Sequence, residues 1–530
     1  MDTHITPNVI AERSLSTPDA VLLREVDGPE LTYRSFHQLS LRWSSLLETI
    51  GVRAGDRVIS MVGGAAGYWT WIGTALLGAQ HVPADPDLRG QRLQHVVAAT
   101  GARVLVVERT SLAWLATSSA ALAAVRCLVV LDGVPEGMAL PFTVYDADDL
   151  LARSEPRPRP AVTPAQVQAG IFTSGTTGPS KCVLRTWETY ENAGSWLFPG
   201  DRPEAGGASA ADGACYSPWP PFHTLALTGL AAAVQRGLRL VVRRGFSLSR
   251  FWPDVRTHGC THCVLIVVAP LLLHRAPSPD DADNSLRYVT MVPLTSDFGE
   301  FGRRFGVAVS AMYGQSETGP LLAAGAPADF RTTGRPVAGI EARIVGPDGT
   351  DVGRGETGEL LVRRAGGGLP FSGYLSAPGA APEQGPADGW FPTGDAFRRD
   401  DRGNFQLMDR IKDYIRHRGH NVSSVELEQE LLGHPSVAEC AFVGVRSDLA
   451  DPGAGAAGDQ DIKAVVVVEP GATLSALDVV RFLEPRLPRY MLPRYVDFVG
   501  ALPRTATLKT RKAELRNGSR GTDVWKLRPR

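Results

Sequence analysis

The chain has 530 residues, and its 55 lysines and arginines against 56 aspartates and glutamates leave a formal net charge of −1. That length exceeds the roughly 300 residues at which a single core stops growing, so we expect at least two domains. The hydrophobic content of 43% argues against a disordered chain. The balanced charge provides no general attraction for nucleic acid or an anionic membrane, so we expect neither as a partner.

The sequence shows neither a secretory signal nor a membrane-spanning segment. Residues 1–10 lack a basic stretch leading into an apolar one, and the most apolar run, 263–273, is too short to span a bilayer. The six cysteines are thinly spread, which suits a reducing compartment. We therefore expect a soluble, cytoplasmic protein.

Cys260 and Cys263 form a Cys-x-x-Cys string with His258 and His262 interleaved, which raises the hypothesis of a metal or redox site. No second ligand pair follows at finger spacing, and residues 264–268 have the pattern of a buried strand. We interpret both cysteines as small core residues.

Strand and helix patterns alternate along the N-terminal part, which favours an α/β fold with parallel or mixed sheets covered by helices. The predicted elements are a hairpin at 21–26 and 31–33, a helix at 33–51, and strands at 57–61, 102–107 and 125–131. A Pro-rich stretch at 152–164 is predicted to be extended and solvated, and to link two subdomains.

The pattern changes after residue 410. The predicted elements there are helices at 425–432 and 476–483, and strands at 439–445 and 463–468. They make a small βαβ-type module of about 110 residues, within the usual size of a domain. The basic run 516–530 is predicted to be a solvated tail.

The strongest chemical signal is the string Ile171-Phe-Thr-Ser-Gly-Thr-Thr-Gly-Pro-Ser-Lys181. Glycines let backbone amides turn toward a polyphosphate, hydroxyls donate further hydrogen bonds, and the lysine adds positive charge. The spacing of the glycines excludes a Walker A loop. The candidate phosphate ligands are Thr173, Ser174, Gly175, Thr176, Thr177, Gly178 and Lys181.

The whole string resembles the phosphate loop of the adenylate-forming (AMP-binding) superfamily, which includes acyl-CoA synthetases, luciferases and peptide-synthetase adenylation domains. The resemblance implies a large N-terminal domain that binds ATP and an acid, followed by a small mobile α+β lid. We expect the division to give domains 1–410 and 411–530. The implied cofactors are ATP and Mg²⁺, with CoA as co-substrate.

A second string, Met312-Tyr-Gly-Gln-Ser-Glu317, stands where the family has an aromatic-Gly-x-Thr-Glu pattern. By this resemblance Tyr313 stacks on adenine beside Gly314, Ser316 donates to phosphate in place of threonine, and Glu317 holds Mg²⁺. Without the resemblance, Tyr-Gly would be interpreted as a turn and Glu317 as a solvated charge.

Three further strings follow in the order of the family. Asp395, in Gly389-Trp-Phe-Pro-Thr-Gly-Asp395, matches the ribose-binding aspartate, because a carboxylate accepts from both ribose hydroxyls. Arg410 matches an arginine that contacts the nucleotide, and Lys412 the hinge residue, with Gly419 near the arm of the incoming thiol. Lys509 matches the C-terminal catalytic lysine, which offsets charge as pyrophosphate leaves.

The sequence departs from the family at two places. Residues 286–296 contain no glycine where many members have several, which suggests a fuller wall around a small or a repositioned acid. Leu508 replaces the usual glycine before the lysine. Ordinary drift within the subfamily is the alternative explanation for both departures.

His223 matches a family string at the acid pocket, where it would act catalytically by orienting the acid or gating the site. A purely structural histidine explains its presence equally well.

The leading hypothesis is an AMP-forming ligase that adenylates a small carboxylic acid and passes the acyl group to CoA. One alternative is adenylation of nitrite for attack by an aryl amine, a diazotase reaction of secondary metabolism, and another is transfer to a carrier protein. A non-catalytic nucleotide-binding protein is disfavoured by the joint presence of Lys181, Glu317, Asp395 and Lys509. The acid and the oligomeric state stay open.

Overall fold

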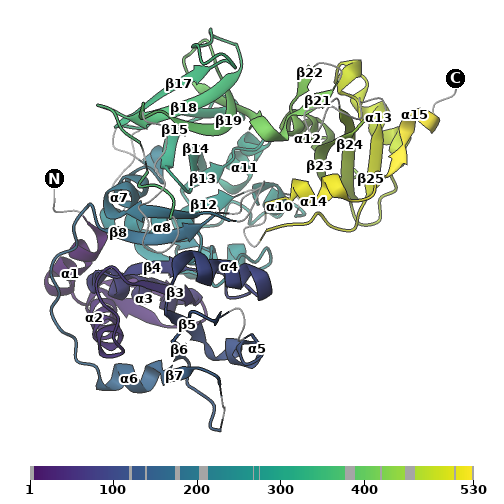
Figure 1. Cartoon of the computed structure of the whole chain (residues 1–530). Helices are drawn as coiled ribbons and strands as arrows, with labels where there is room; N and C mark the ends of the chain where they lie inside the picture. Colours follow the sequence, from purple (N-terminus) through teal and green to yellow (C-terminus); the bar gives the residue numbers. More distant parts are fainter. Residues whose placement is uncertain are drawn as a thin grey trace. The chain divides into compact units, whose positions relative to one another are not determined.

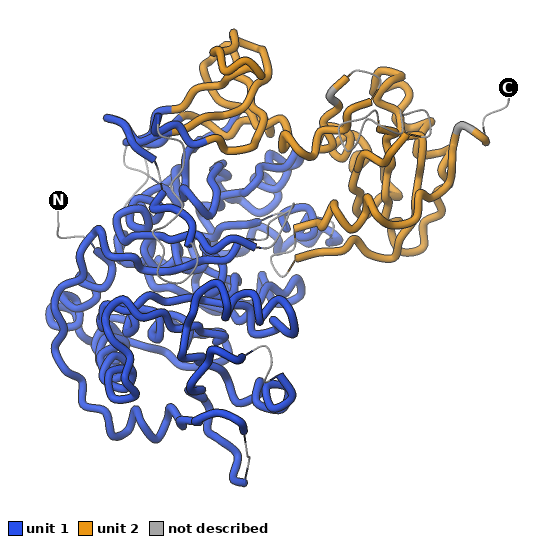
Figure 2. Tube along the Cα trace, viewed as in Figure 1, with its two compact units in different colours: residues 1–328, 336–341, 363–391 blue, residues 329–335, 342–362, 392–530 orange. Residues whose placement is uncertain are grey.

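The computed structural model describes residues 5–118, 122–137, 140–173, 180–201, 213–266, 268–273, 275–369, 371–375, 388–417, 420–447, 460–505 and 509–527. The chain divides into two compact units, which Figure 2 shows in different colours. Unit 1 comprises residues 1–328, 336–341 and 363–391, and unit 2 comprises residues 329–335, 342–362 and 392–530.

The first sheet of unit 1 has seven strands in the order β7-β6-β5-β3-β4-β8-β9. All neighbours are parallel except β8 and β9, which pair antiparallel on either side of the phosphate string. Three of these strands were predicted from their apolar runs, β3, β5 and β6. The bounds are β3 Arg57–Met61, β4 Gln80–Pro83, β5 Val104–Glu108, β6 Cys127–Leu131, β7 Thr143–Asp146, β8 Val167–Phe172 and β9 Cys182–Thr186.

Helix α4 (Gly90–Thr100) and the short helix α5 (Leu112–Leu115) cover one face of this sheet (Figure 1). Alternate strand residues such as Leu105 and Val107 pack against Leu93 of α4 and are fully buried. The residues between them, such as Val106, are buried as well, so both faces of the central strands are covered. This double burial is why these strands have continuous apolar runs.

The second group of strands in unit 1 runs in the order β15-β14-β13-β12-β10-β11-β1-β2. The predicted hairpin at the start of the chain is confirmed as the antiparallel pair β1 and β2. The bounds are β1 Val21–Glu25, β2 Glu30–Thr32, β10 Ala214–Ser217, β11 Arg239–Val242, β12 His262–Ile266, β13 Tyr288–Val292, β14 Ala308–Gln315 and β15 Gly319–Ala324.

The remaining helices of unit 1 pack around these sheets (Figure 1). Their bounds are α1 Thr6–Ser16, α2 Tyr33–Thr49, α3 Gly64–Leu76, α6 Ala147–Arg153, α7 Trp187–Ser195, α8 Thr224–Arg236, α9 Phe251–Thr257, α10 Ala269–Leu273 and α11 Phe298–Phe305, with one-turn helices η1 Arg109–Ser111 and η3 Pro199–Asp201. No helix in the described ranges is both long and apolar enough to cross a membrane. The mixed α/β fold that the alternating pattern predicted is confirmed.

The Pro-rich stretch 152–164 differs from its prediction. It is extended beyond Arg153, as expected, but it connects α6 to β8 within unit 1 and does not link two subdomains. Nor is it fully solvated, because Asn8 of α1 exchanges two hydrogen bonds with the backbone of Val162, which is buried. Arg159 forms an ion pair with Glu48 of α2. A proline-rich pattern reveals extension but not the surface on which the segment packs.

Unit 2 holds most of the strands β17-β18-β19-β20-β16, in that order, and a smaller four-stranded sheet, β23-β24-β25-β26. In the smaller sheet, β23 and β24 are antiparallel, whereas β24, α13 and β25 form a parallel β-α-β unit. The strands of the larger group are β16 Thr332–Pro336, β17 Ile340–Val345, β18 Gly358–Arg364, β19 Phe391–Arg399 and β20 Phe405–Arg410. The other elements are η5 Ile411–Asp413, β21 Ile415–His417, β22 His420–Val422, α12 Ser424–Leu432, β23 Val437–Arg446, β24 Gln460–Val468, α13 Ala476–Leu483, η7 Arg489–Met491, β25 Tyr495–Phe498, α14 Lys512–Asn517, β26 Thr522–Asp523 and α15 Val524–Leu527.

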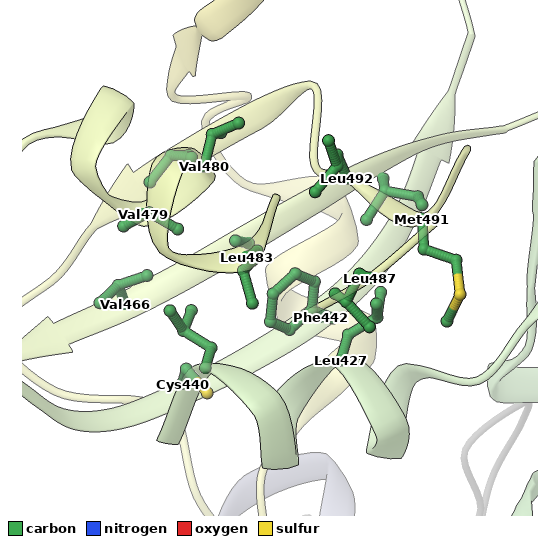
Figure 3. Packing of buried hydrophobic residues seen from close by; sticks show 14 of the residues in the cluster. Leu427, Cys440, Phe442, Val466, Val479, Val480, Leu483, Leu487, Met491 and Leu492 are labelled. Atoms are coloured by element: carbon green, nitrogen blue, oxygen red, sulfur yellow. The ribbon is translucent and has the colours of Figure 1, made fainter. Parts of the chain in front are cut away.

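Figure 3 shows the hydrophobic core of the C-terminal part of unit 2, where Leu427 of α12, Phe442 of β23 and Leu483 of α13 gather. All three side chains are fully buried. Both helices and both strands that the sequence predicted here are present, because each presents its apolar residues to this one core.

The prediction of a solvated tail at 516–530 is wrong in part, although residues 517–522 and Lys526 are exposed. Residues 522–523 form β26, which pairs antiparallel with β25, and Val524 is fully buried in the same core. Three apolar residues, Val524, Trp525 and Leu527, among many polar and basic ones leave too weak a periodicity to predict an element.

Candidate active site

The phosphate string forms the connection between the antiparallel strands β8 and β9. The candidate ligands Ser174, Gly175, Thr176, Thr177 and Gly178 lie outside the described residues. At the base of the connection, the Thr173 backbone N–H donates to the Lys181 carbonyl at 2.9 Å, and the Thr173 hydroxyl donates to it at 3.4 Å. These hydrogen bonds hold together the two ends of the loop, where the chain leaves β8 and enters β9.

Lys181 and Glu317 meet at the ring of Tyr374. The Lys181 ammonium lies 4.6 Å from the centre of the ring, and the Tyr374 hydroxyl donates to Glu317 Oε1 at 3.2 Å. The segment that carries Tyr374 is itself tied to β9, because the Leu184 N–H donates to the Gly373 carbonyl. A cation and a carboxylate from distant parts of the sequence thus share one aromatic residue.

Ser316 and Glu317 occupy the turn of the β14-β15 hairpin, in which Gln315 faces Gly319. A Cβ atom on Gly314 would lie 2.1 Å from the Gly319 carbonyl oxygen, so only glycine fits there. Tyr313, just before it, is 7% exposed, and its hydroxyl accepts a hydrogen bond from Gln315 at 3.3 Å. One hairpin therefore holds all four candidates, with Tyr313 and Gly314 at the end of β14 and Ser316 and Glu317 in the turn.

Asp395 and Arg410 lie directly opposite each other on the antiparallel strands β19 and β20 of unit 2. Arg410 Nε is 3.2 Å from Asp395 Oδ1 in an ion pair. Asp395 is buried, whereas about half of the Arg410 side chain is exposed. The Asp395 N–H donates to the hydroxyl of Thr393, which in turn donates to the Leu360 carbonyl. This pairing of two predicted site residues follows from the strand register.

Lys412 lies in the single turn η5, directly after Arg410. Burial lowers the pKa of its ammonium, and the Arg410 charge lowers it further while Asp413 opposes the change. Just before this turn in the chain, the Asp409 carboxylate accepts hydrogen bonds from the backbone N–H and the hydroxyl of Ser424, at the start of α12. A carboxylate at the N-terminus of a helix is favourably placed with respect to the helix dipole.

Lys509 is exposed, and two backbone hydrogen bonds tie it to Thr505. Its carbonyl accepts from the Thr505 N–H at 2.8 Å, and its own N–H donates to the Thr505 hydroxyl at 3.1 Å. Leu508 lies outside the described residues, so its effect on this loop stays a prediction. Three residues later, the partly buried Lys512 forms an ion pair with Glu428 of α12 at 2.7 Å.

His223 caps helix α8. Its Nδ1 accepts the Leu225 N–H at 3.2 Å, which satisfies one of the free amides at the helix start. This contact gives the histidine a structural task, and its catalytic task stays a prediction. In the glycine-poor segment 286–296, residues 288–292 form β13 and Pro293 is exposed.

The Cys-x-x-Cys string is buried at the start of strand β12. Cys263 lies in β12, and burial raises the pKa of its thiol well above the usual range. His262 is also buried and bonds Asp201 at 2.8 Å. In the described ranges, no group of three or more histidine, cysteine or acidic side chains is arranged to hold a metal ion. The full burial of Cys260 and Cys263 agrees with the interpretation of both cysteines as core residues.

Sequence reasoning missed Tyr374 and Arg185. Tyr374 stands in a short Ser-Gly-Tyr string that carries no distinctive signal, and Arg185 has the pattern of an ordinary charge in a strand. The structure shows the buried Arg185 guanidinium donating to the Ser316 carbonyl at 2.9 Å. Residues Lys181, Ser316 and Glu317 thus come together in unit 1, and Asp395 and Arg410 in unit 2.

Two family models cover most of the chain. Residues 10–375 match the AMP-binding enzyme family, and residues 426–509 match the AMP-binding enzyme C-terminal domain. These matches define the class as nucleotide-binding enzymes with a separate C-terminal domain.

Curated relatives cover nearly the full length. The chain is 30% identical to the medium/long-chain-fatty-acid–CoA ligase FadD6 of Mycobacterium tuberculosis, over 97% of this chain and 86% of the relative. It is 29% identical to the crotonobetaine/carnitine–CoA ligase of Salmonella arizonae, over 92% of this chain and 93% of the relative. Among solved structures, the anthranilate CoA ligase AuaEII in complex with anthranoyl-AMP superposes with a TM-score of 0.82 at 22% identity, covering 97% of both chains.

The chain belongs to the AMP-binding enzyme family, the adenylate-forming superfamily that its motifs predicted, in the acid–CoA ligase branch.

Proposed function

We propose that this protein is an ATP-dependent ligase that converts a small carboxylic acid to its acyl-adenylate and then to its CoA thioester. The relatives named above are acid–CoA ligases, and the solved structure named above is a complex with an acyl-adenylate, anthranoyl-AMP. The acids in those names differ widely, so the proposal specifies a carboxylic acid without naming it.

The observation that carries the proposal is the meeting of Lys181 and Glu317 at Tyr374. A phosphate loop needs a cation at its end, and Mg²⁺ prefers carboxylate oxygens as ligands. In this proposal, the triphosphate passes between these two groups. The donor set therefore fits ATP with its metal ion.

The other predicted residues would hold the rest of the nucleotide. The loop residues 173–178 would surround the phosphates, and Tyr313 and Gly314 would lie against the adenine, with Ser316 donating to phosphate. Asp395, held by Arg410 and Thr393, has the buried carboxylate that two ribose hydroxyls require.

In the first step, an oxygen of the acid attacks the α-phosphorus, and the bond to the bridging oxygen of pyrophosphate breaks. Lys509 would offset the negative charge that develops at the reacting oxygens. Magnesium, when bound, supplies positive charge to the phosphates. The contribution of the protein is positioning and charge, without a covalent enzyme intermediate.

In the second step, the thiol of CoA, as its thiolate, attacks the carbonyl carbon of the adenylate, and AMP leaves. We propose that Lys412 is the hinge on which the C-terminal part, 411–530, reorients between the two steps. A single turn between two strands is the kind of short segment that absorbs large dihedral changes. We assign to His223 the task of orienting the acid.

The test is a pyrophosphate-release assay over a panel of carboxylic acids, each with and without CoA. We expect release with a subset of small acids, and thioester formation only when CoA is present. The panel includes nitrite with an aminoaryl acid. Release with that pair alone, without CoA, would replace the carboxylate ligase by the diazotase, and absence of release with every acid would overturn both.

A further inference from the structure

Arg185 is a buried cation in a place where a strand normally carries an apolar residue. It lies in β9, four residues after Lys181, and only 1% of its surface is exposed. Among the described residues, it has no carboxylate within ion-pairing distance. Burying a guanidinium costs free energy unless other groups compensate, so its partners are informative.

The guanidinium bridges two backbone carbonyls. Nη1 donates to the Ser316 carbonyl at 2.9 Å, and Nη2 donates to the Thr189 carbonyl at 3.2 Å. Its Nε is buried without a hydrogen-bond partner in the described part of the chain. Burial lowers the pKa of Arg185 to about 10, while Tyr190 and Glu317 act in the opposite direction. The side chain therefore stays charged at neutral pH.

The turn that Arg185 contacts has little freedom of its own. Gly319 adopts a φ of +71°, and a Cβ atom there would lie 3.2 Å from Arg185 Nη2. The guanidinium thus fills the space on the buried side of the turn, while Glu317 reaches Tyr374. Arg185 connects the strand that leaves the phosphate loop with the turn that carries Ser316 and Glu317.

We propose that Arg185 is a positioning residue of the nucleotide site, which fixes the Ser316-Glu317 turn and balances the Glu317 charge so that the carboxylate is held ready for the metal ion. This inference rests on the proposed nucleotide and metal roles of Ser316 and Glu317. In this role, Arg185 acts on the nucleotide site through the Ser316-Glu317 turn and does not itself contact the nucleotide.

The test compares ATP affinity with and without Mg²⁺ by calorimetry, in the absence of any acid. The variants are Arg185→Lys and Arg185→Met in the full chain. The matched control is Arg304→Met, because Arg304 also donates to backbone carbonyls, those of Leu273 and Arg275, outside both nucleotide strings. A purely structural role would lower thermal stability in every variant but leave the ratio of the two affinities unchanged.

We expect Mg²⁺ to increase the ATP affinity of the wild type and of Arg304→Met by the same factor. In Arg185→Met that factor should fall about tenfold, since a charge-assisted hydrogen bond to the turn is lost. Arg185→Lys should show an intermediate loss, because an ammonium cannot bridge both carbonyls.

If Mg²⁺ increased the ATP affinity of Arg185→Met by the same factor as that of the wild type, the inference would be overturned and the proposed function would stay intact. If Arg185→Met does not fold, Arg185→Lys decides, and an unchanged ratio there also overturns the inference. A wild type that binds no ATP with or without Mg²⁺ would overturn the proposed nucleotide site, and the role of Arg185 with it.

Discussion

Lys509 is an exposed residue whose backbone is held by Thr505, and we proposed above that its ammonium offsets charge at the reacting oxygens. Lys509→Ala should reduce adenylate formation by roughly a hundredfold or more, the loss typical of removing a group that stabilises transition-state charge. Because the side chain is exposed, the free energy of unfolding should change by less than about 0.5 kcal/mol.

The measurement for Lys509→Ala is the rate of pyrophosphate release with the preferred acid. Lys526→Ala, which removes a lysine that is also exposed on unit 2, is the control and should retain the wild-type rate. Equal rates for the wild type and Lys509→Ala would remove Lys509 from the catalytic residues.

The sequence indicated candidate site residues but not the contacts between them. The strings that hold Lys181, Glu317 and Asp395 could be found because glycines and hydroxyls recur at family spacing. The Tyr374 contact joins segments 57 residues apart, and the Arg185 contact joins segments 131 residues apart. No local pattern encodes such contacts, since strand order and register decide them.

At the scale of elements, helix α7 holds a buried carboxylate that ties it to the N-terminal helix. Glu191 accepts hydrogen bonds from the Thr6 N–H at 2.6 Å and from Gln235 Nε2 at 2.7 Å. Burial raises its pKa to about 7, although both hydrogen bonds act in the opposite direction. The native state therefore holds a proton that the unfolded state releases at lower pH.

This shift predicts how stability changes with pH. Between pH 4.5 and about 7 the native state binds more protons at Glu191 than the unfolded state does, so stability falls as pH rises through this range. The loss is on the order of 3 kcal/mol. The Glu191→Gln side chain cannot ionise. Between pH 5 and pH 8, the free energy of unfolding of this variant should therefore fall less than that of the wild type, by about the loss just given.

Urea unfolding at the two pH values measures the difference. Glu188→Gln on the same helix is the control, because the Glu188 carboxylate is exposed in an ion pair with Arg364. Identical pH profiles for the wild type and Glu191→Gln would show that Glu191 does not titrate in this range.

The elements themselves were predictable where one pattern dominates. Strand β3 at Arg57–Met61 has the predicted bounds, and α13 at Ala476–Leu483 does too, since each has an apolar period that matches its geometry. The predictions were wrong for segments whose structure depends on another part of the chain against which they pack. Examples are β26, which pairs with β25, and the Pro-rich stretch, which packs against α1.

At the scale of the whole molecule, the predicted division into two parts has a counterpart in the two compact units, although unit 2 also takes in strands from before residue 410. The boundary at 410 and the hinge at Lys412 remain predictions. Local anion sites suit a chain whose net charge is −1, because the charge that binds ATP comes from a few placed groups and not from a basic surface.

The central claim is that ATP is cleaved between its α- and β-phosphates, with transfer of the adenylate to an acid. The most direct measurement is identification of the products by mass spectrometry after incubation with ATP, Mg²⁺ and the preferred acid. We predict acyl-adenylate and pyrophosphate without CoA, and equal amounts of AMP, pyrophosphate and acyl-CoA when CoA is added. Formation of ADP and phosphate would contradict the account.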